Sequence, residues 1–279
     1  MNSSRFIWYE LATSDLEGAR VFYGGVLGWS FTESLVSGSP YSLGTLGKTP
    51  ICGLMELPED ANRQGVRPSW TGYVGVDDVD ATVDRVRQLG GVVYVPSTKI
   101  PNVSRFSVVA DPQSAIVAVL QWLQSDREEG AAIGTHGRVG WHELLSIDWE
   151  KAWAFYSALF GWRKVVTDTD AMGSYQLFSD GLETTGGMFT KPATVPVPFW
   201  LFYFNVDDLD AAIARVTERG GHVINGPIEV PDGLWIFQCV DSQGAIFGLV
   251  GKRCHKRVIV AGSKRTSNLR FAGPETRWR

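Results

Sequence analysis

Two pairs of residues in this chain place an indole next to a carboxylate. Trp8 lies two residues before Glu10, and Trp141 lies two residues before Glu143. On a β-strand, residues two apart project from the same face, so each indole would lie beside its carboxylate. A carboxylate half-enclosed by apolar surface is harder to ionise, and its pKa rises. We therefore expect Glu10 and Glu143 to act as bases or hydrogen-bond acceptors, with Trp8 and Trp141 as ligand-contacting walls.

Each of these residues also has a purely structural interpretation. The tryptophans could be core residues, because large aromatic side chains dominate burial. Glu10 and Glu143 could accept hydrogen bonds from backbone N–H groups or bridge two domains. His142, next to Glu143, is a further ligand-contacting candidate, but an isolated histidine is commonly a satisfied or surface side chain.

Both pairs belong to an internal repeat. One constant offset superimposes Trp8, Glu10, Asp15, Phe22, Tyr23, Gly28 and Trp29 on Trp141, Glu143, Asp148, Phe155, Tyr156, Gly161 and Trp162. A slightly smaller offset superimposes Val76-Asp77-Asp78 on Val206-Asp207-Asp208, and Asp111 and Gln113 on Asp241 and Gln243. The period spans a whole domain. It is too long for a solenoid unit and predicts two duplicated domains.

The repeat sets the expected domain boundaries. We expect an N-terminal domain at 4–122, a linker at 123–136, a C-terminal domain at 137–251 and a basic tail at 252–279. The linker is rich in charged residues, Gly and Ala, as domain boundaries often are. The tail carries nine Lys or Arg and one acid. It could bind an acidic partner, or be a disordered extension, which is the commoner fate of such a run.

Hydrophobic spacing predicts strand–helix–strand–strand–strand twice in each half. Strands are expected at 5–12, 29–36, 41–46, 51–57, 70–76, 92–99, 104–110 and 115–121, with the second half opening at 138–145. Ser14 with Glu17 forms a capping-box pattern, and the other helix N-caps are assigned to Asp148, Asp77, Asp80, Asp207 and Asp210. Few helices among many strands favour an α+β fold: two curved mixed sheets with helices on the outer face.

Composition excludes several classes of partner. The formal charge of −4 combines about +8 in the tail with about −12 in residues 1–251. An acidic body argues against nucleic acid as the main ligand. No apolar run approaches the ~20 residues of a membrane span, and the N-terminus lacks the apolar region of a signal peptide. The three cysteines lie far apart, which fits a reducing cytoplasm.

The order of motifs resembles a known superfamily. An Asp-capped helix with Phe22-Tyr23, then Leu27-Gly28-Trp29, the Val76-Asp77-Asp78 entry and the Asp111-Pro112-Gln113 turn occur in the same order in both halves. This order is similar to that of the vicinal-oxygen-chelate superfamily, which includes glyoxalase I, bleomycin-resistance proteins and extradiol dioxygenases. The resemblance implies a cup closed by two βαβββ modules in each half. It also implies, in the enzymes, a divalent metal that acts as a Lewis acid.

The positions that the resemblance assigns to metal ligands hold unsuitable side chains. They are Trp8, Thr71 and Ala118 in the first half and Trp141, Leu201 and Gly248 in the second. Divalent metals need imidazole, carboxylate or thiolate donors. We therefore expect cups without a metal cofactor, although a residual divalent site is an alternative. Trp70 and Trp200, which repeat beside the second of these positions, are further candidates for ligand contact.

Three functions remain open at this point. The first is a metal-independent protein that binds or sequesters a small organic molecule, aromatic or related to a dicarbonyl. The second is a glyoxalase-like lyase, isomerase or dioxygenase that uses Glu10, Glu143 or a residual metal. The third is an interaction protein that binds through its tail. The two halves are expected to pair within one chain, and the sequence does not set any further oligomeric state.

Overall fold

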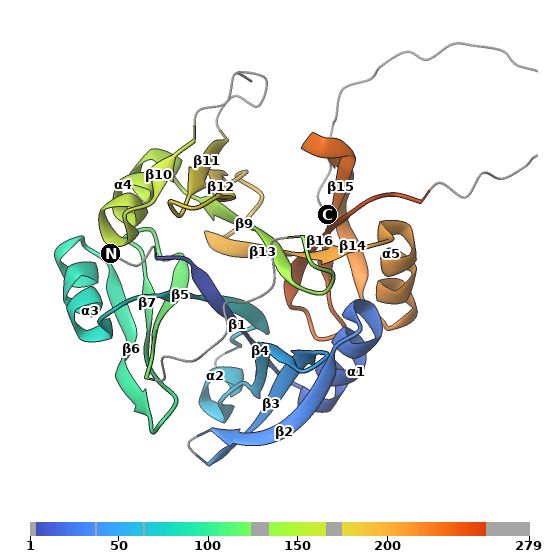
Figure 1. Cartoon of the computed structure of the whole chain (residues 1–279), viewed down its shortest axis with the longest axis horizontal. Coiled ribbons are helices and arrows are strands. Elements are labelled where there is room, and N and C mark those ends of the chain that lie inside the picture. Colours follow the sequence, from blue (N-terminus) through green and yellow to red (C-terminus); the bar gives the residue numbers. More distant parts are fainter. Residues whose placement is uncertain (1–3, 37, 64, 124–133, 166–174, 255–279) are drawn as a thin grey trace, which may run out of the picture.

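Both halves are built from two βαβββ modules, as the hydrophobic spacing predicts. The computed structural model describes residues 4–36, 38–63, 65–123, 134–165 and 175–254 (Figure 1). The first half contains β1 (Phe6–Thr13), α1 (Leu16–Leu27), β2 (Ser30–Val36), β3 (Ser39–Leu46), β4 (Thr49–Glu56), α2 (Glu59–Arg63), β5 (Ser69–Gly75), α3 (Val79–Gln88), β6 (Val92–Ile100), β7 (Ser104–Ala110) and β8 (Ile116–Trp122). The short helix α2 joins the two modules and was not predicted.

The second half repeats this order, but within its described residues no helix corresponds to α2. It contains β9 (Val139–Ser146), α4 (Trp149–Phe160), β10 (Arg163–Lys164), β11 (Gln176–Ser179), β12 (Thr184–Thr190), β13 (Phe199–Val206), α5 (Leu209–Glu218), β14 (His222–Val230), a 3-10 turn (Pro231–Gly233), β15 (Leu234–Val240) and β16 (Ile246–Gly251). Most of the expected linker and tail, residues 124–133 and 255–279, lies outside the described residues.

Each half forms one curled, eight-stranded mixed sheet. The strand orders are β2-β3-β4-β1-β5-β8-β7-β6 and β10-β11-β12-β9-β13-β16-β15-β14. The opening strands of the two modules are antiparallel neighbours at the centre, where Glu10 lies opposite Thr71 and Trp8 opposite Tyr73. The copy aligns Glu143 with Leu201 and Trp141 with Tyr203. The expected α+β fold is confirmed, and its central strands carry the candidate site residues.

Aspartates cap the helices, but not all of those expected. The N-cap of α1 is Asp15, whose carboxylate accepts the Gly18 N–H at 2.9 Å, so Ser14 was wrongly assigned. Asp148 caps α4 as predicted. Gly28 ends α1 in the left-handed conformation that glycine tolerates best.

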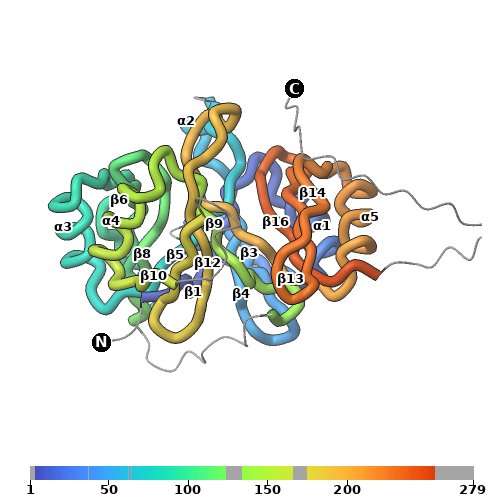
Figure 2. The backbone as a smooth tube through the Cα atoms, turned by 90° about the horizontal axis from the view of Figure 1, so that it is seen from above, coloured from blue at the N-terminus to red at the C-terminus, as the bar shows by residue number. Residues whose placement is uncertain are grey.

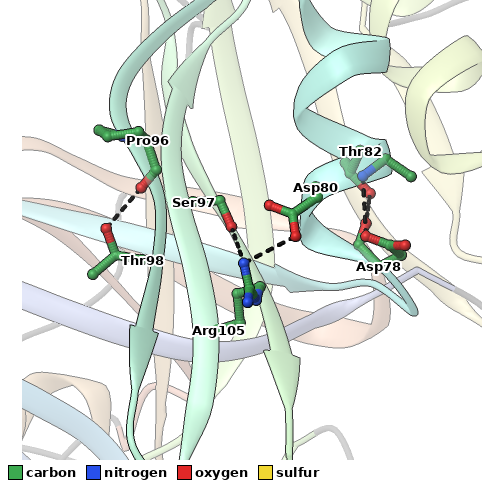
Figure 3. Close-up of polar contacts among 8 residues, drawn as sticks. Asp78, Asp80, Thr82, Pro96, Ser97, Thr98 and Arg105 are labelled. Atoms are coloured by element: carbon green, nitrogen blue, oxygen red, sulfur yellow. Dashed lines mark hydrogen bonds and ion pairs between the residues drawn. The ribbon is translucent and has the colours of Figure 1, made fainter.

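The second helix of each half begins one residue later than predicted. The caps of α3 and α5 are Asp78 and Asp208, which accept the N–H of Ala81 and of Ala211, so the assignment to the neighbouring aspartates was wrong. In Figure 3, Asp80 turns away from the helix end and pairs with Arg105 of β7. Asp210 similarly pairs with Arg253. One-residue errors of this kind arise because adjacent aspartates look alike in a sequence.

One continuous apolar core joins the two halves. It contains residues of α1, α3, α4 and α5 and the helix-facing side chains of both sheets. Helices pair across the halves, with α1 beside α5 and α3 beside α4 (Figures 1 and 2). The polar contacts across this boundary are reciprocal. The Trp29 indole donates to the Gly137 carbonyl and the Trp162 indole to the Ser4 carbonyl.

Each sheet also has a face turned away from the helices, called here the inner face. Trp8, Tyr73, Ala118 and Leu120 form a separate small apolar cluster there, and Leu145, Leu201, Tyr203 and Val250 form its counterpart. Within the described residues, no helix is long and apolar enough to cross a membrane.

Candidate functional site

The carboxylate of Glu10 lies on the inner face of the first sheet between two tyrosines. The hydroxyl of Tyr41 on β3 donates to Oε1 at 2.8 Å, and that of Tyr73 on β5 donates to Oε2 at 2.5 Å. The indole of Trp8 hydrogen-bonds the Tyr41 hydroxyl, and its ring packs edge-on against Trp122. Trp8, Glu10, Tyr41 and Tyr73 are called the Glu10 cluster below.

The second half builds the same arrangement around Glu143. The Tyr175 hydroxyl donates to Oε1 at 2.9 Å, and the Tyr203 hydroxyl donates to Oε2 at 2.8 Å. The Trp141 indole donates to the Tyr175 hydroxyl at 2.9 Å. We call Trp141, Glu143, Tyr175 and Tyr203 the Glu143 cluster. The structure thus brings each predicted Trp–Glu pair together on one face. The glutamates accept hydrogen bonds from tyrosine hydroxyls, and not from the backbone N–H groups that the sequence analysis considered.

Among the described residues, the Glu143 cluster has an amide branch that the Glu10 cluster lacks. The side-chain amide of Gln238 on β15 donates to the Tyr203 hydroxyl at 2.8 Å, and its Nε2 lies 3.5 Å from Glu143 Oε2. The Asn225 amide donates to Oε1 of Gln238 at 3.2 Å. The offset that superimposes Asp111 on Asp241 relates Val95 and Val108 to Asn225 and Gln238. The Glu10 cluster therefore has an apolar wall where the Glu143 cluster has two amides.

Two glycines make room for the tyrosines. A Cβ at Gly53 would lie 1.7 Å from the Tyr41 hydroxyl, and one at Gly187 would lie 2.1 Å from the Tyr175 ring. Contacts this short exclude any other residue unless the ring moves. Gly53 pairs with Glu10 across β1 and β4, and Gly187 pairs with Glu143 across β9 and β12. Each phenol is therefore held beside its carboxylate by the backbone beneath it.

Burial and hydrogen bonding oppose each other at both carboxylates. Burial raises the pKa of Glu10, the hydroxyls of Tyr73 and Tyr41 lower it, and the net shift is upward. The pKa of Glu143 is likewise raised by burial, against the hydroxyls of Tyr203 and Tyr175. Burial first, and then the neighbouring carboxylate, raise the pKa of the four phenols, which remain protonated donors.

The side chains at the expected metal-ligand positions do not fit a divalent ion. Trp8, Thr71 and Ala118 lie on the adjacent strands β1, β5 and β8 of the first sheet. They offer an indole, a hydroxyl and a methyl group. Each cluster has one carboxylate, with both oxygens already bound by phenols, and the described residues contain no group of three or more His, Cys, Asp or Glu suited to a metal. This donor set is too poor for the ions that prefer imidazole, thiolate or several oxygens.

Trp70 and Trp200 lie on the other side of the sheets from the two clusters. Both are buried in the shared core. The Trp70 indole donates to the Tyr23 hydroxyl at 2.9 Å, which in turn donates to Asp241 of the other half at 2.9 Å. Trp200 makes the equivalent bond to Tyr156, which reaches Asp111. The structure therefore does not bring these tryptophans together with Glu10 or Glu143.

His142 also points away from Glu143, into the boundary between the halves. Its Nδ1 lies 2.7 Å from the Thr185 carbonyl, which can only accept, so Nδ1 carries the proton. Its Nε2 accepts the Tyr9 hydroxyl at 2.6 Å, and its ring stacks on Phe6 at 4.2 Å between centroids. Burial is the main cause that lowers the pKa of His142 to about 4. The neutral imidazole fits a structural contact between the halves.

Sequence reasoning missed the four tyrosines. They reach the glutamates through strand order, from 31 and 63 residues away in the first half and from 32 and 60 in the second. A signal for them was present, because Tyr41 and Gly53 recur in the second half as Tyr175 and Gly187, and Tyr73 recurs as Tyr203. Polar residues that recur with the repeat on the faces carrying Glu10 and Glu143 would have pointed to this cluster.

Comparisons with known proteins agree on one family. A sequence model described as Glyoxalase/Bleomycin resistance protein/Dioxygenase superfamily matches residues 5–117 and again 138–248. The protein named "Putative glyoxylase CFP32" of Mycobacterium bovis is 34% identical over 246 residues, which cover 87% of this chain and 93% of that protein. The protein named "Anthracycline biosynthesis protein DauV" of a Streptomyces species is 30% identical over 270 residues, covering 88% and 92%.

Solved structures share the fold at low sequence identity. The Mn(II)-bound glyoxalase from Novosphingobium aromaticivorans has a TM-score of 0.62 at 13% identity, covering 89% of this chain and 83% of that one. Homoprotocatechuate 2,3-dioxygenase from Arthrobacter globiformis has a TM-score of 0.63 at 14% identity, covering 89% and 79%.

Proposed function

Because this chain belongs to the Glyoxalase/Bleomycin resistance protein/Dioxygenase superfamily, we propose that the inner face of each sheet binds a small organic molecule at its glutamate–tyrosine cluster, without a divalent metal. The observation that carries the proposal is the duplicated Glu–Tyr–Tyr arrangement, in which two tyrosine hydroxyls donate to one glutamate carboxylate in each half. The bound molecule would be sequestered against aromatic rings and oriented by one hydrogen-bonding group.

The surroundings of the Glu10 cluster support binding of an apolar or aromatic molecule. Glu10, Tyr41 and Thr71 keep partial exposure on the inner face, as do Phe106 and Trp122 beside them. Sites of this kind combine aromatic walls with a few placed polar groups. One relative is named as an anthracycline biosynthesis protein. Anthracyclines are polycyclic aromatic compounds, which is consistent with an aromatic ligand here.

Intrinsic tryptophan fluorescence during titration with aromatic and dicarbonyl compounds tests this function. Trp8 and Trp141 belong to the clusters, so a bound ligand should quench or shift the emission. Glu10→Gln and Glu143→Gln should each weaken binding in one half only. Glu183→Gln, the same change on an exposed turn, is the matched control. A folded protein whose emission responds to none of the compounds contradicts the proposal.

Metal analysis gives an independent prediction. After purification without added metal, we expect well below one Fe, Zn, Mn or Ni per half, and ligand binding that survives chelation. Near-stoichiometric metal, retained through dialysis and lost together with ligand binding on chelation, would show that the cluster residues or their neighbours do hold an ion. Elemental analysis before and after dialysis makes the measurement.

The raised pKa of both glutamates favours a second candidate, a glyoxalase-like lyase or isomerase that uses Glu10 or Glu143 as a base. A base with a raised pKa is a better proton acceptor near neutral pH. The double variant Glu10→Gln/Glu143→Gln should then abolish turnover of dicarbonyl substrates while the protein stays folded. Unchanged turnover in the folded double variant rules out this role.

A further inference from the structure

The hydrogen bonds of each cluster run in one direction, toward the carboxylate. An indole N–H can donate and cannot accept. The Trp141 indole donates to the Tyr175 hydroxyl, so the single proton of that hydroxyl is available for Glu143 Oε1. Tyr203 accepts from Gln238 and gives its proton to Oε2. Both oxygens of Glu143 thus accept hydrogen bonds from neighbouring side chains.

This arrangement is complete only when the glutamate is an anion. A protonated carboxyl would need an acceptor for its own proton, and the nearest hydroxyls already point their protons at it. The Glu10 cluster follows the same pattern, with Trp8 bound to Tyr41 and both phenols donating to Glu10. The hydrogen bonds therefore favour the anion in both halves, against the burial that raises the pKa of each glutamate.

No cation balances these anions within the described part of the chain. The ion pairs found there involve neither Glu10 nor Glu143. The hydrogen-bond partners of the two carboxylates are phenols and, at Glu143, one amide. Buried charges in proteins are normally paired, because an isolated charge loses much of its solvation.

The carboxylates also have unused acceptor capacity. A carboxylate offers about four acceptor positions, and the two phenols occupy one on each oxygen. At Glu10 about one position per oxygen therefore remains for a ligand. At Glu143 the Gln238 amide also lies 3.5 Å from Oε2, so the free position is on Oε1. The neighbouring Tyr and Trp rings present negative π faces, which attract cations as well.

We propose that the ligand presents a protonated amine, carried on an apolar or aromatic body, to Glu10 or Glu143. This inference rests on the proposed function and adds the charge of the ligand. An ammonium group supplies several N–H donors and the missing positive charge. The negative charge of this site is opposite to that of a metal centre, which attracts anionic oxygen ligands. We therefore expect the site to reject compounds that carry a carboxylate or a phosphate.

Three probes of matched shape test the charge preference: 2-(1-naphthyl)ethylamine, 2-(1-naphthyl)ethanol and 1-naphthylacetate. Calorimetric titration of the full chain near neutral pH should rank the amine at least about tenfold tighter than the alcohol, the scale of one charge-assisted hydrogen bond, and the acetate weakest. Glu10→Gln/Glu143→Gln should bring the amine and the alcohol within about threefold of each other. Glu183→Gln should keep the ranking of the unmodified protein.

The outcomes separate this inference from the function on which it rests. Equal binding of amine and alcohol, or tighter binding of the acetate, overturns the charge preference and leaves small-molecule binding intact. Binding of none of the probes by the folded protein overturns both. The ranking of the probes in the unmodified chain decides the inference even if the double variant fails to fold.

Discussion

Two phenolic protons hold each carboxylate, and one of the two comes from a tyrosine that packs against a glycine. Tyr41 and Tyr175 each hold one oxygen of a glutamate that has no cationic partner among the described residues. Their position depends on Gly53 and Gly187, so the site is specified by pairs of residues. Substituting Tyr41 or Tyr175 should therefore act mainly through the glutamate, by removing a hydrogen bond to its carboxylate.

Replacing either tyrosine by phenylalanine tests this dependence. Tyr41→Phe or Tyr175→Phe removes one hydroxyl that donates to a charged acceptor, and should lower the free energy of unfolding by about 1.5–3 kcal/mol. It should also raise the pKa of the glutamate further. Urea denaturation at neutral pH measures the first effect. Tyr94→Phe, on an exposed edge strand, is the control, and an equal change in all three variants would contradict the expectation.

His142 makes a prediction about acid stability. Burial is the largest cause of its lowered pKa of about 4, against the Thr185 carbonyl and the charge of Asp180, which raise it. An unfolded histidine titrates near 6.5, so the unfolded state takes up a proton first as the pH falls. The stabilisation from the neutral imidazole is present above about pH 6.5. It is lost, by about 3 kcal/mol in total, as the pH falls toward 4.

Comparison of unfolding free energies between neutral pH and pH 4.5 isolates this contribution. His142→Gln keeps a donor and an acceptor but does not titrate, so its stability should fall less than that of the unmodified chain. The exposed His222→Gln should follow the unmodified chain. Identical pH profiles for all three proteins would mean that His142 is not the neutral, buried group described above.

Helices and strands were predicted well where the signal is local. Strand alternation placed Trp8 with Glu10 because the period of a strand is fixed by covalent geometry. It did not reveal Tyr41 or Tyr73, because the order of strands in a sheet depends on tertiary packing. The same limit explains Trp70: the sequence shows its position on a strand, but only the assembled sheet shows that its face lies in the shared core.

Helix capping gives a prediction at this scale. Asp15→Ala should cost about 1 kcal/mol, and Asp148→Ala should also destabilise the chain, because each carboxylate accepts a backbone N–H at the start of a helix. Ser14→Ala should cost little, since Ser14 is not the cap. Thermal or urea unfolding of the three variants provides the comparison. A larger loss for Ser14→Ala than for Asp15→Ala would reverse the assignment.

The whole molecule behaves as two copies locked by reciprocal contacts. Tyr23 of the first half reaches Asp241 of the second, and Tyr156 of the second reaches Asp111 of the first. These contacts lie in a core that includes residues of both halves. We therefore expect the chain to unfold as one cooperative unit, although the sequence reads as two domains.

Differential scanning calorimetry distinguishes one cooperative unfolding unit from two. The unmodified chain should show a single transition, and Tyr23→Phe and Tyr156→Phe should lower its midpoint to a similar extent. Each change leaves a buried indole N–H without a partner, at a cost of about 1–3 kcal/mol, while each aspartate keeps its backbone N–H donors. Two separate transitions, with each variant shifting only one of them, would show that the halves unfold independently.

The amide branch at Gln238 has a consequence for how this protein could change over time. In an assembly of two identical subunits, every substitution enters both sites at once, so a change that suits one ligand is imposed on the other site. Joining the copies in a single polypeptide removes that constraint. The contrast between Asn225 with Gln238 and their counterparts Val95 with Val108 shows that the two sites have already diverged. A chain of this kind can keep one site for its original ligand while the other acquires a new one.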